Sequence, residues 1–301
     1  MICNLVSIVI PTFKRLKKLH QAIESVLNQT HSSIEILVIN DDDSDDNHVL
    51  NVIDSFKDSR IKYFKNSRKK GANGARNTGI LNANGEYIAF LDDDDEWLIN
   101  KLEGQLKCLK TKKDTYGGVY SGYLIEKNKK WEEYIGNVEG RIINEVILDE
   151  VKVCTGSNLL IKTETIKKVG LWDEDLLRQQ DLEFLIRFLN DYELAFDKNT
   201  VVKIYGHNTP NPKKAFKERE KYILKISNFL KMLPENKMNQ FYSDHYRRQA
   251  IYLLKMNETR IALKYWKKAI KINLISSRKD IKILFFYFKN IYKPINNKKL
   301  L

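Results

Sequence analysis

The residues of this sequence with the clearest chemical potential are four consecutive aspartates, Asp92 to Asp95, with Glu96 behind them. Like charges this close repel one another unless a cation offsets them. Mg²⁺ and Mn²⁺ commonly take one or two protein carboxylates together with phosphate oxygens of a ligand. The alternative is an acidic surface turn. The run directly follows the apolar stretch IAFL, and this placement at the end of a buried strand favours the metal site.

A second acidic cluster, NDDDSDD, spans Asn40 to Asp46 and follows the apolar run IEILVI. Carboxylates at the end of such a strand accept hydrogen bonds from the nucleoside in nucleotide-binding folds. The structural alternative is that they cap the next helix and interact with its dipole. That alternative accounts for Asp45 and Asp46 but not for all five carboxylates.

A third segment, KKGANGARN, spans Lys69 to Asn77. Its glycines precede a helical pattern, and the N-terminus of a helix offers backbone N–H groups to an anion, to which Arg76 would add a charged fork. Gly-rich turns before helices occur in many folds, so this segment alone identifies no site.

Short apolar runs alternate with helical patterns along the first hundred residues. The pattern predicts strands at 5–10, 34–39, 61–64 and 87–91, and helices at 16–28, 48–56 and from the Gly-rich segment to 83. Such alternation is typical of an α/β fold with a mostly parallel sheet and helices on both faces. Because ligands bind at the carboxyl ends of parallel strands, we expect the polar clusters after the first, second and fourth strands to converge on one edge.

The remaining chain predicts a looser second half and a helical tail. Strands are expected at 119–125, 193–196 and 201–205, an apolar stretch at 158–161 and a helix at 182–190. The segment NTPNPKK at 208–214 holds two of the five prolines and is the expected linker. We therefore predict two domains, 1–207 and 208–301, the second being α-helical.

The charge also divides near this point. Residues 211–301 contain 23 Lys and Arg against 6 Asp and Glu, whereas residues 1–210 are mildly acidic, within a total net charge of +13. This asymmetry favours a catalytic or binding body with a basic attachment surface. An anionic membrane surface or a polyprenyl-diphosphate acceptor would suit the tail, and the alternative is that its apolar face packs on the body or on a second subunit.

Composition narrows the class of protein. A chain of 301 residues with 43% hydrophobic residues can bury a core, which excludes wholesale disorder. Three distant cysteines give neither a disulfide framework nor a zinc spacing and fit a reducing compartment. The N-terminus has no signal-peptide pattern, and the apolar run at 283–288 is too short to cross a bilayer. We expect a cytoplasmic protein, either soluble or peripheral on the inner face of the membrane.

Four segments together resemble a family 2 glycosyltransferase of the GT-A fold. They are PTFKR, IEILVINDD, GANGARNTGILNANGEYIAFLDDDDEW and GLWDEDLLRQQDLEFLIRF. The resemblance covers roughly residues 5–205 and implies a nucleotide-binding half at 1–117 and an acceptor half at 118–207. It implies inverting transfer of a sugar, with UDP favoured as the nucleotide, to an acceptor hydroxyl in bacterial surface polysaccharide, glycolipid or glycan synthesis. The acceptor would be a saccharide or a polyprenyl-linked molecule.

The resemblance also assigns nucleotide contacts. In this family the turn after the first strand lies against the base, which here means Pro11, Thr12 and Phe13. The acidic position that binds uracil corresponds best to Asp41. The arginine of the ARN segment, Arg76, would lie near the nucleotide.

The metal and the catalytic base follow in the same way. The family's Asp-x-Asp motif falls on Asp92, Asp93 and Asp94. Asp94 would be the direct ligand of Mn²⁺ or Mg²⁺, with Asp92 a second candidate ligand. The family's base is the aspartate of a Glu-Asp pair, which corresponds to Asp181. Without the resemblance, Asp181 is interpreted as the N-cap of the helix that follows.

The sequence departs from the family pattern at several of these positions. Asn40 stands where the family usually has Asp, and Asp42-Asp43 replace its usual Gly-Ser, which leaves open a shift of the uracil contact by one residue. Gln180 replaces the usual Glu before the base. His207 follows the last expected strand and is a candidate ligand for the metal or the diphosphate, the alternative being a structural histidine.

Two other functions compete with sugar transfer. A sugar-phosphate nucleotidyltransferase shares a related core and an acidic metal site, but it normally has a Gly-rich loop after the first strand, where this sequence has PTFKR. A non-enzymatic protein that binds nucleic acid or another anion through the tail would leave Asp92–Asp95 and Asp181 without purpose. The tail shows no nucleic-acid-binding motif, so no nucleic-acid partner is expected.

Overall fold

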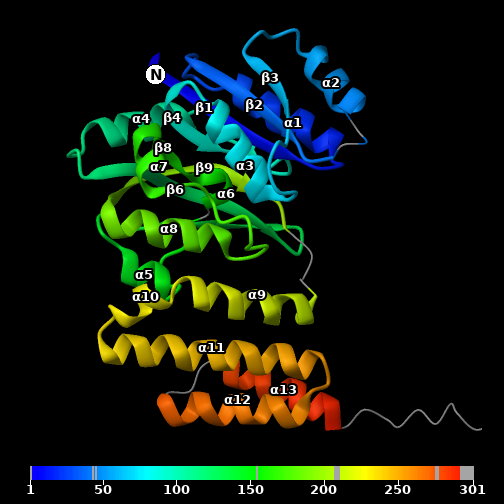
Figure 1. Ribbon diagram of the computed structural model, residues 1–301, viewed down its shortest axis with the longest axis vertical. Coiled ribbons are helices and arrows are strands. Elements are labelled where there is room, and N and C mark those ends of the chain that lie inside the picture. The colour runs from blue at the N-terminus through cyan, green and yellow to red at the C-terminus, as the bar shows by residue number, and fades with distance from the viewer. Residues whose placement is uncertain are drawn as a thin grey trace, which may run out of the picture. The chain divides into compact units, whose positions relative to one another are not determined.

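The computed structural model describes residues 2–42, 44, 46–153, 155–206, 211–274 and 278–291. The chain divides into two compact units, Met1–His207 and Asn208–Leu301. The first unit contains a mixed sheet with flanking helices, and the second unit is helical (Figure 1). The division falls at the start of the proline-containing segment 208–214.

The strands of the first unit pair into one sheet, which has nine strands within the described residues. The strands are β1 (Ile2–Thr12), β2 (Ile34–Asn40), β3 (Ile61–Lys65), β4 (Gly85–Phe90), β5 (Glu96–Trp97), β6 (Tyr116–Lys127), β7 (Lys130–Tyr134), β8 (Leu160–Lys162) and β9 (Glu193–Ile204). The helices are α1 (Leu16–Leu27), α2 (Asp46–Ser55), α3 (Ala72–Asn82), α4 (Lys101–Lys110), α5 (Ile143–Ile147), α6 (Thr155–Asn158), α7 (Thr163–Val169) and α8 (Gln180–Asp191).

The sheet order is β3-β2-β1-β4-β8-β6-β9-β5, with β7 paired to β6. The first four strands in this order are parallel, because a helix follows each of β1, β2 and β3 and returns the chain to the same end of the sheet. The second half mixes directions: β8 is antiparallel to both neighbours, whereas β6 and β9 are parallel. The α/β class and the expected parallel strands are therefore observed.

One expected feature of the sheet was wrong. The segments 193–196 and 201–205, predicted as two short strands, belong to the single strand β9. Its pairing with β6 shifts register between Asp197 and Thr200. The Asp197 carboxylate accepts a bond from the Asn199 side chain at 2.8 Å, and this local turn chemistry produced the apparent break. The ladder resumes beyond it because Val201 and Val202 are buried.

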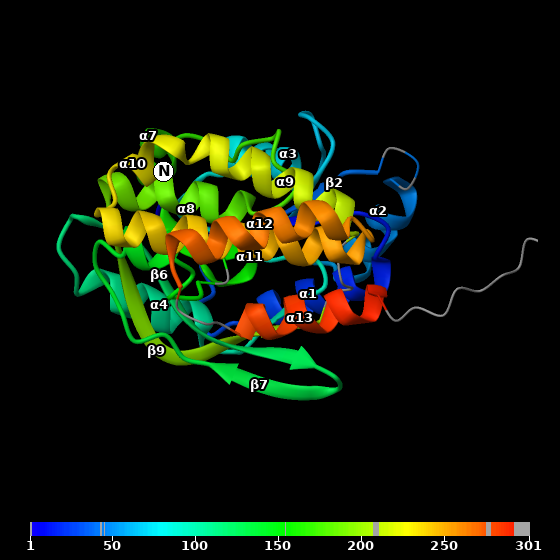
Figure 2. The same ribbon diagram turned by 90° about the horizontal axis from the view of Figure 1, so that it is seen from below.

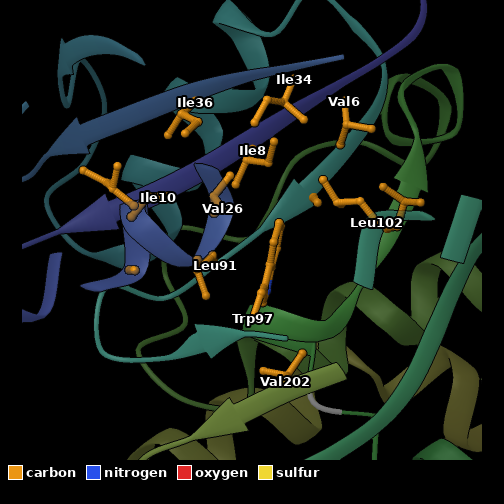
Figure 3. Packing of buried hydrophobic residues seen from close by; sticks show 14 of the residues in the cluster. Val6, Ile8, Ile10, Val26, Ile34, Ile36, Leu91, Trp97, Leu102 and Val202 are labelled. Carbon is orange, nitrogen blue, oxygen red and sulfur yellow. The ribbon is translucent and has the colours of Figure 1, made fainter. Parts of the chain in front are cut away.

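Successive side chains of β1 point to opposite faces of the sheet. Val6, Ile8 and Ile10 point into the larger core cluster, which also receives residues of α1, α2 and α4 (Figure 3). Val9 points to the opposite face, where α3 crosses the strand. A Cβ on Gly79 would lie 2.3 Å from Val9 Cγ1, so α3 approaches the sheet this closely only because residue 79 is glycine.

The second unit confirms the predicted helical tail. Its helices are α9 (Pro212–Lys225), α10 (Ser227–Lys231), α11 (Glu235–Lys255), α12 (Thr259–Ile272) and α13 (Arg278–Ile291). Helix α11 packs against α9, α12 and α13 (Figure 1, Figure 2). A small apolar core joins α11, α12 and α13 through Ala250, Leu253, Leu254, Ala262 and Ile283. Among the described residues, no helix is both long and apolar enough to cross a membrane.

Local chemistry explains where α9 begins. Pro212 occupies the first turn, where its fixed φ suits a helix and its missing N–H costs nothing. The Asn211 side chain accepts bonds from the backbone N–H groups of Lys213 and Lys214 at 3.0 and 3.3 Å. Asn211 and Pro212, which belong to the predicted linker, therefore start a helix.

His245 on α11 makes the stability of the second unit pH-dependent. Burial lowers its pKa to about 3, with a further contribution from the nearby Arg219 cation and an opposing one from Asp244. An unfolded histidine titrates near 6.5, so below that pH the unfolded chain binds a proton that the folded chain does not. We expect stability to be constant above about pH 7 and to fall by up to about 1.4 kcal/mol per pH unit below about 6.5.

Hydrogen exchange of the α11 amides at pH 5 and pH 7, corrected for intrinsic rates, measures this effect. The variant His245→Gln should lose less protection at pH 5 than the native protein, because it removes the titrating imidazole. The same pH dependence in both proteins would contradict the assignment.

Candidate functional site

The predicted site residues converge at one cavity in the first unit. The cavity has a volume of about 340 Å³ and lies where β1, β2 and β4 end. It is lined by Pro11, Thr12, Phe13, Arg15, Asp41, Ala72, Ala75, Arg76, Asp92, Asp93, Asp94 and Gln180. Eight positions singled out from the sequence therefore surround one space. The ninth, Asp181, directly follows the lining residue Gln180 in the first turn of α8.

Asp93 is held by the turn after β1. Its carboxylate accepts bonds from Thr12 Oγ1 at 2.9 Å, from the Phe13 N–H at 3.3 Å and from Arg15 Nη1 at 2.8 Å. Burial raises the pKa of Asp93, while the bonds from Arg15 and Thr12 act against that rise. The conformation of the turn is thus tied to a carboxylate, because Thr12 and the Phe13 N–H both bond Asp93 directly.

Arg15 is the main residue that sequence reasoning missed. Its Nη1 lies 2.8 Å from Asp93 Oδ1 and 2.9 Å from Asp94 Oδ2, so one guanidinium bridges two adjacent carboxylates. In the sequence, Arg15 is visible only as the last residue of PTFKR. The signal that could have found it is electrostatic, because buried adjacent aspartates require a nearby cation and the turn after β1 carries one.

Asp92 is held from another direction. Arg76, which is buried, forms an ion pair with Asp92, and its guanidinium lies 5.1 Å from the centre of the Trp172 ring. A Cβ on Gly156 would lie 2.6 Å from Asp92 Oδ2 and 3.5 Å from Arg76 Nη2. The ion pair therefore packs against the backbone at Gly156, and only a glycine leaves room for it.

Asp95, although part of the same run, does not line the cavity. Its carboxylate accepts bonds from Ser157 Oγ at 2.5 Å and from the Tyr205 N–H at 3.3 Å. Burial, together with the charges of Asp92 and Asp94, raises its pKa well above the usual range. Asp95 thus joins the end of β4 to α6 and to the segment after β9, and its role is structural.

Of the described acidic residues in the second cluster, Asp41 is the one that lines the cavity. It accepts bonds from Asn66 Nδ2 at 2.6 Å and from the Gly71 N–H at 2.8 Å. The backbone N–H expected to serve an anion thus binds a carboxylate of the protein. Asn40 is buried and shapes the turn, since its side chain both donates to and accepts from the backbone of Asp42.

The loop before α8 is attached to α3 by two asparagines. Asn77 donates to the Trp172 carbonyl at 2.9 Å and accepts from the Trp172 N–H at 2.9 Å. Asn73 donates to the carbonyls of Asp173 and Leu176 at 2.6 and 2.9 Å. The sequence pattern showed these asparagines only as members of a Gly-rich turn, because their partners lie about a hundred residues away.

Asp181 occupies the second residue of α8. The N-cap is Gln179, in a left-handed conformation and without a side-chain capping bond, so the interpretation of Asp181 as an N-cap was wrong. Glu183, two residues further in the same first turn, forms an ion pair with Arg187 at 2.6 Å. The remaining candidate, His207, lies outside the described residues.

The donors around the cavity fit a particular kind of metal site. Within the described ranges, no group of three or more His, Cys, Asp or Glu side chains is arranged to hold an ion by itself. Asp92, Asp93 and Asp94 nevertheless present carboxylates to one cavity, where Arg15 already supplies a cation. This donor set suits a divalent ion that takes one or two carboxylates from the protein and its other oxygens from a bound phosphate.

Comparison with known proteins identifies the family. The model of glycosyl transferase family 2 matches residues 7–170, a range that contains every cavity-lining residue except Gln180. The chain belongs to this glycosyltransferase family. The resemblance of the sequence motifs to family 2 is therefore confirmed.

Two relatives differ in their identity to this chain and in how much of it they cover. An uncharacterized glycosyltransferase of Rickettsia felis is 32% identical over 78% of this chain and 40% of its own length. The Escherichia coli enzyme WfgD, a UDP-Glc:α-D-GlcNAc-diphosphoundecaprenol β-1,3-glucosyltransferase, is 45% identical over 41% of this chain and 47% of its own length. The chain thus spans less than half the length of either relative.

Solved structures confirm the GT-A fold class. S. aureus TarS in complex with UDP-GlcNAc has a TM-score of 0.66 and 13% identity, covering 95% of this chain and 90% of TarS. The mannosyltransferase PcManGT of Pyrobaculum calidifontis, in complex with GDP-Man and Mn²⁺, has a TM-score of 0.58 and 14% identity, covering 97% and 81% of the two chains. Family 2 enzymes of this fold typically use a divalent metal.

Substitutions in the aspartate run should change thermal stability by different amounts, because Asp95 makes structural contacts whereas Asp94 faces the cavity. Asp95→Ala removes the acceptor of Ser157 and of the Tyr205 N–H, and an unsatisfied buried donor costs about 1–3 kcal/mol. The thermal midpoint should fall by roughly 2–6 °C. Asp94→Ala, measured in parallel without ligand, should change the midpoint little, because its partner Arg15 is half exposed and keeps its ion pair with Asp93. Equal destabilisation by both substitutions would contradict this division.

Proposed function

We propose that this protein is an inverting, metal-dependent glycosyltransferase that moves a sugar from a UDP-sugar to a hydroxyl of a polyprenyl-diphosphate-linked saccharide. The observation that carries the proposal is the convergence of Asp92, Asp93 and Asp94 with the turn after β1 and with Asp41 around one cavity. Its volume of about 340 Å³ falls within the range of small-molecule sites.

The nucleoside would bind at the β1–β2 side of the cavity. Phe13 is 52% exposed there and offers an aromatic face to a base. Asp41, fixed by Asn66 and Gly71, offers carboxylate oxygens to the N–H of a uracil ring. UDP is also the nucleotide in the name of WfgD and in the TarS complex.

The diphosphate would lie at the end of β4. Asp94, with Asp92 as the second candidate, would hold a Mn²⁺ or Mg²⁺ ion, which would supply Lewis-acid stabilisation of the departing diphosphate. Arg15 is half exposed beside these carboxylates, so its guanidinium is within reach of a phosphate oxygen. Arg76 stays buried against Asp92 and orients that carboxylate.

Asp181 would act as the general base. It would accept the proton of the acceptor hydroxyl as that oxygen attacks the anomeric carbon, and one displacement inverts the configuration. The loop before α8 supports this role, because the bonds from Asn73 and Asn77 fix where the helix begins. Gln180 completes the cavity wall beside the base.

The acceptor assignment rests on the relatives and on the fold. WfgD acts on a diphosphoundecaprenol-linked sugar, and we carry this acceptor class over to the present chain. The acceptor would be bound by residues 118–207, the half of the first unit that contains α8. The product would enter a bacterial surface polysaccharide, glycolipid or glycan.

Transfer assays with UDP-sugars and a polyprenyl-diphosphate-linked sugar test this function. Asp181→Asn should lower kcat by about 10²–10⁴-fold while leaving UDP affinity unchanged, because the change keeps the shape of the side chain and removes only its basicity. Asp191→Asn, at the exposed C-terminal end of the same helix, is the matched control and should keep full activity. Full activity of Asp181→Asn, or a product with retained anomeric configuration, would contradict the mechanism.

A further inference from the structure

Helix α13 has an inner face that is firmly packed in the second unit. Asp280 is buried and accepts from Arg247 Nε of α11 at 2.8 Å and from Trp266 Nε1 of α12 at 2.8 Å. Ile283 is fully buried in the core shared with α11. Near the other end, Asn290 donates to the Leu254 carbonyl at 2.8 Å. The orientation of α13 about its own axis is therefore determined.

The outer face of the same helix exposes large apolar side chains. Five of them are 40–68% exposed, namely Ile281, Leu284, Phe285, Phe288 and Ile291. Their spacing of three and four residues puts them on one stripe, which is centred roughly 140° around the helix from the buried Ile283. A contiguous exposed apolar patch of this kind marks an interaction surface. We call these five residues the outer stripe.

Basic side chains border the outer stripe. Lys282 and Lys289 are exposed and lie seven residues apart, hence on one line along the helix. A cavity of about 460 Å³ opens between α11 and α13. It is lined by Arg248, Ile251, Tyr252, Lys255, Lys279, Lys282, Phe285 and Phe286.

The charges of this cavity do not cancel. Asp244 forms ion pairs with Arg248 at 2.6 Å and with Lys279, so a single negative charge faces two positive ones. Lys255 lies 5.5 Å from the centre of the Phe286 ring, and Lys282 adds a further positive charge at the edge of the outer stripe. The cavity is thus a cationic pocket with apolar and aromatic walls, directly beside exposed phenylalanines.

We propose that the outer stripe and this cationic pocket dock the protein on a bilayer that contains anionic phospholipid. Phe285 and Phe288 enter the boundary between headgroups and acyl chains, and a lipid phosphate binds near Lys255 and Lys282. An amphipathic helix that lies in the interface combines an apolar stripe with flanking lysines, as α13 does. A second copy of the chain fits this surface less well, because two equally basic faces repel each other.

This surface is a separate feature from the proposed sugar transfer. The second unit holds all of its residues, and docking is measured without donor, acceptor or turnover. The two proposals can therefore fail independently. They are linked only in that a polyprenyl-linked acceptor would itself reside in a membrane.

Co-sedimentation of the full chain with vesicles tests the proposal. The native protein should bind vesicles of phosphatidylcholine with phosphatidylglycerol, and should bind pure phosphatidylcholine vesicles much less. Phe285→Ser with Phe288→Ser should weaken binding by about tenfold or more. Lys282→Gln with Lys289→Gln should weaken it by about fivefold for each lysine and reduce its dependence on salt.

Leu224→Ser provides the matched control, because Leu224 is 74% exposed on α9 and lies outside the outer stripe. It should bind vesicles like the native protein. Thermal midpoints of all variants, measured alongside, should be unchanged, since every altered side chain is exposed.

Three outcomes would overturn the proposal. The first is no binding of the native protein to anionic vesicles, and the second is equal binding to neutral and anionic vesicles. The third is a native dimer in sedimentation velocity that becomes monomeric in the double phenylalanine variant, which would assign the outer stripe to a second copy of the chain.

Discussion

The first unit depends on placing four adjacent carboxylates at the end of a buried strand. Each needs a partner, because the four charges repel one another and Asp93, Asp94 and Asp95 are also buried. Arg15 compensates Asp93 and Asp94, and Arg76 compensates Asp92. Asp95 instead accepts bonds from Ser157 and from a backbone N–H. These partners come from the turn after β1, from α3, from α6 and from the segment after β9, so one short acidic run brings distant parts of the chain together.

Arg76 and its two flanking asparagines extend this arrangement across the first unit. The guanidinium lies between Asp92 and the Trp172 ring, and Trp172 in turn stacks on Phe184 of α8 at 4.6 Å between ring centres. Asn73 and Asn77 bind the backbone of the same loop. Helix α3 therefore links the proposed nucleotide side of the cavity with the helix that carries the proposed base, so one rigid element positions both.

The sequence was sufficient to predict the parallel half of the sheet and the convergence of its polar ends. Strands such as β2, in which every residue is buried, are mostly apolar despite Glu35 and Asn40, and the topology of parallel strands brings their carboxyl ends to one edge. The bridging role of Arg15 and the loop contacts of Asn77 were not predictable in this way. They depend on side-chain directions and on partners distant in sequence, which no local pattern contains.

The burial of Lys101 in the core is likewise not predictable from the local sequence. A lysine in a charged, helical stretch is expected at the surface, yet Lys101 is fully buried. Its Nζ lies 2.8 Å from Gln105 Oε1 and 3.9 Å from the centre of the Trp97 ring, and burial lowers its pKa well below the usual range. Only the fold shows that these two partners are near enough to replace water.

Calorimetric titration with UDP, with and without Mn²⁺, tests the central claim that the carboxylates at the end of β4 form a site for a metal-bound nucleotide. The native protein should bind UDP more tightly when Mn²⁺ is present, and in preference to GDP and dTDP. Asp94→Asn should lose the metal-dependent part of the affinity, because one negative oxygen donor is replaced by an amide. An affinity for UDP that is the same with and without Mn²⁺ would contradict the claim, and so would equal metal-dependent affinities in the native and substituted proteins.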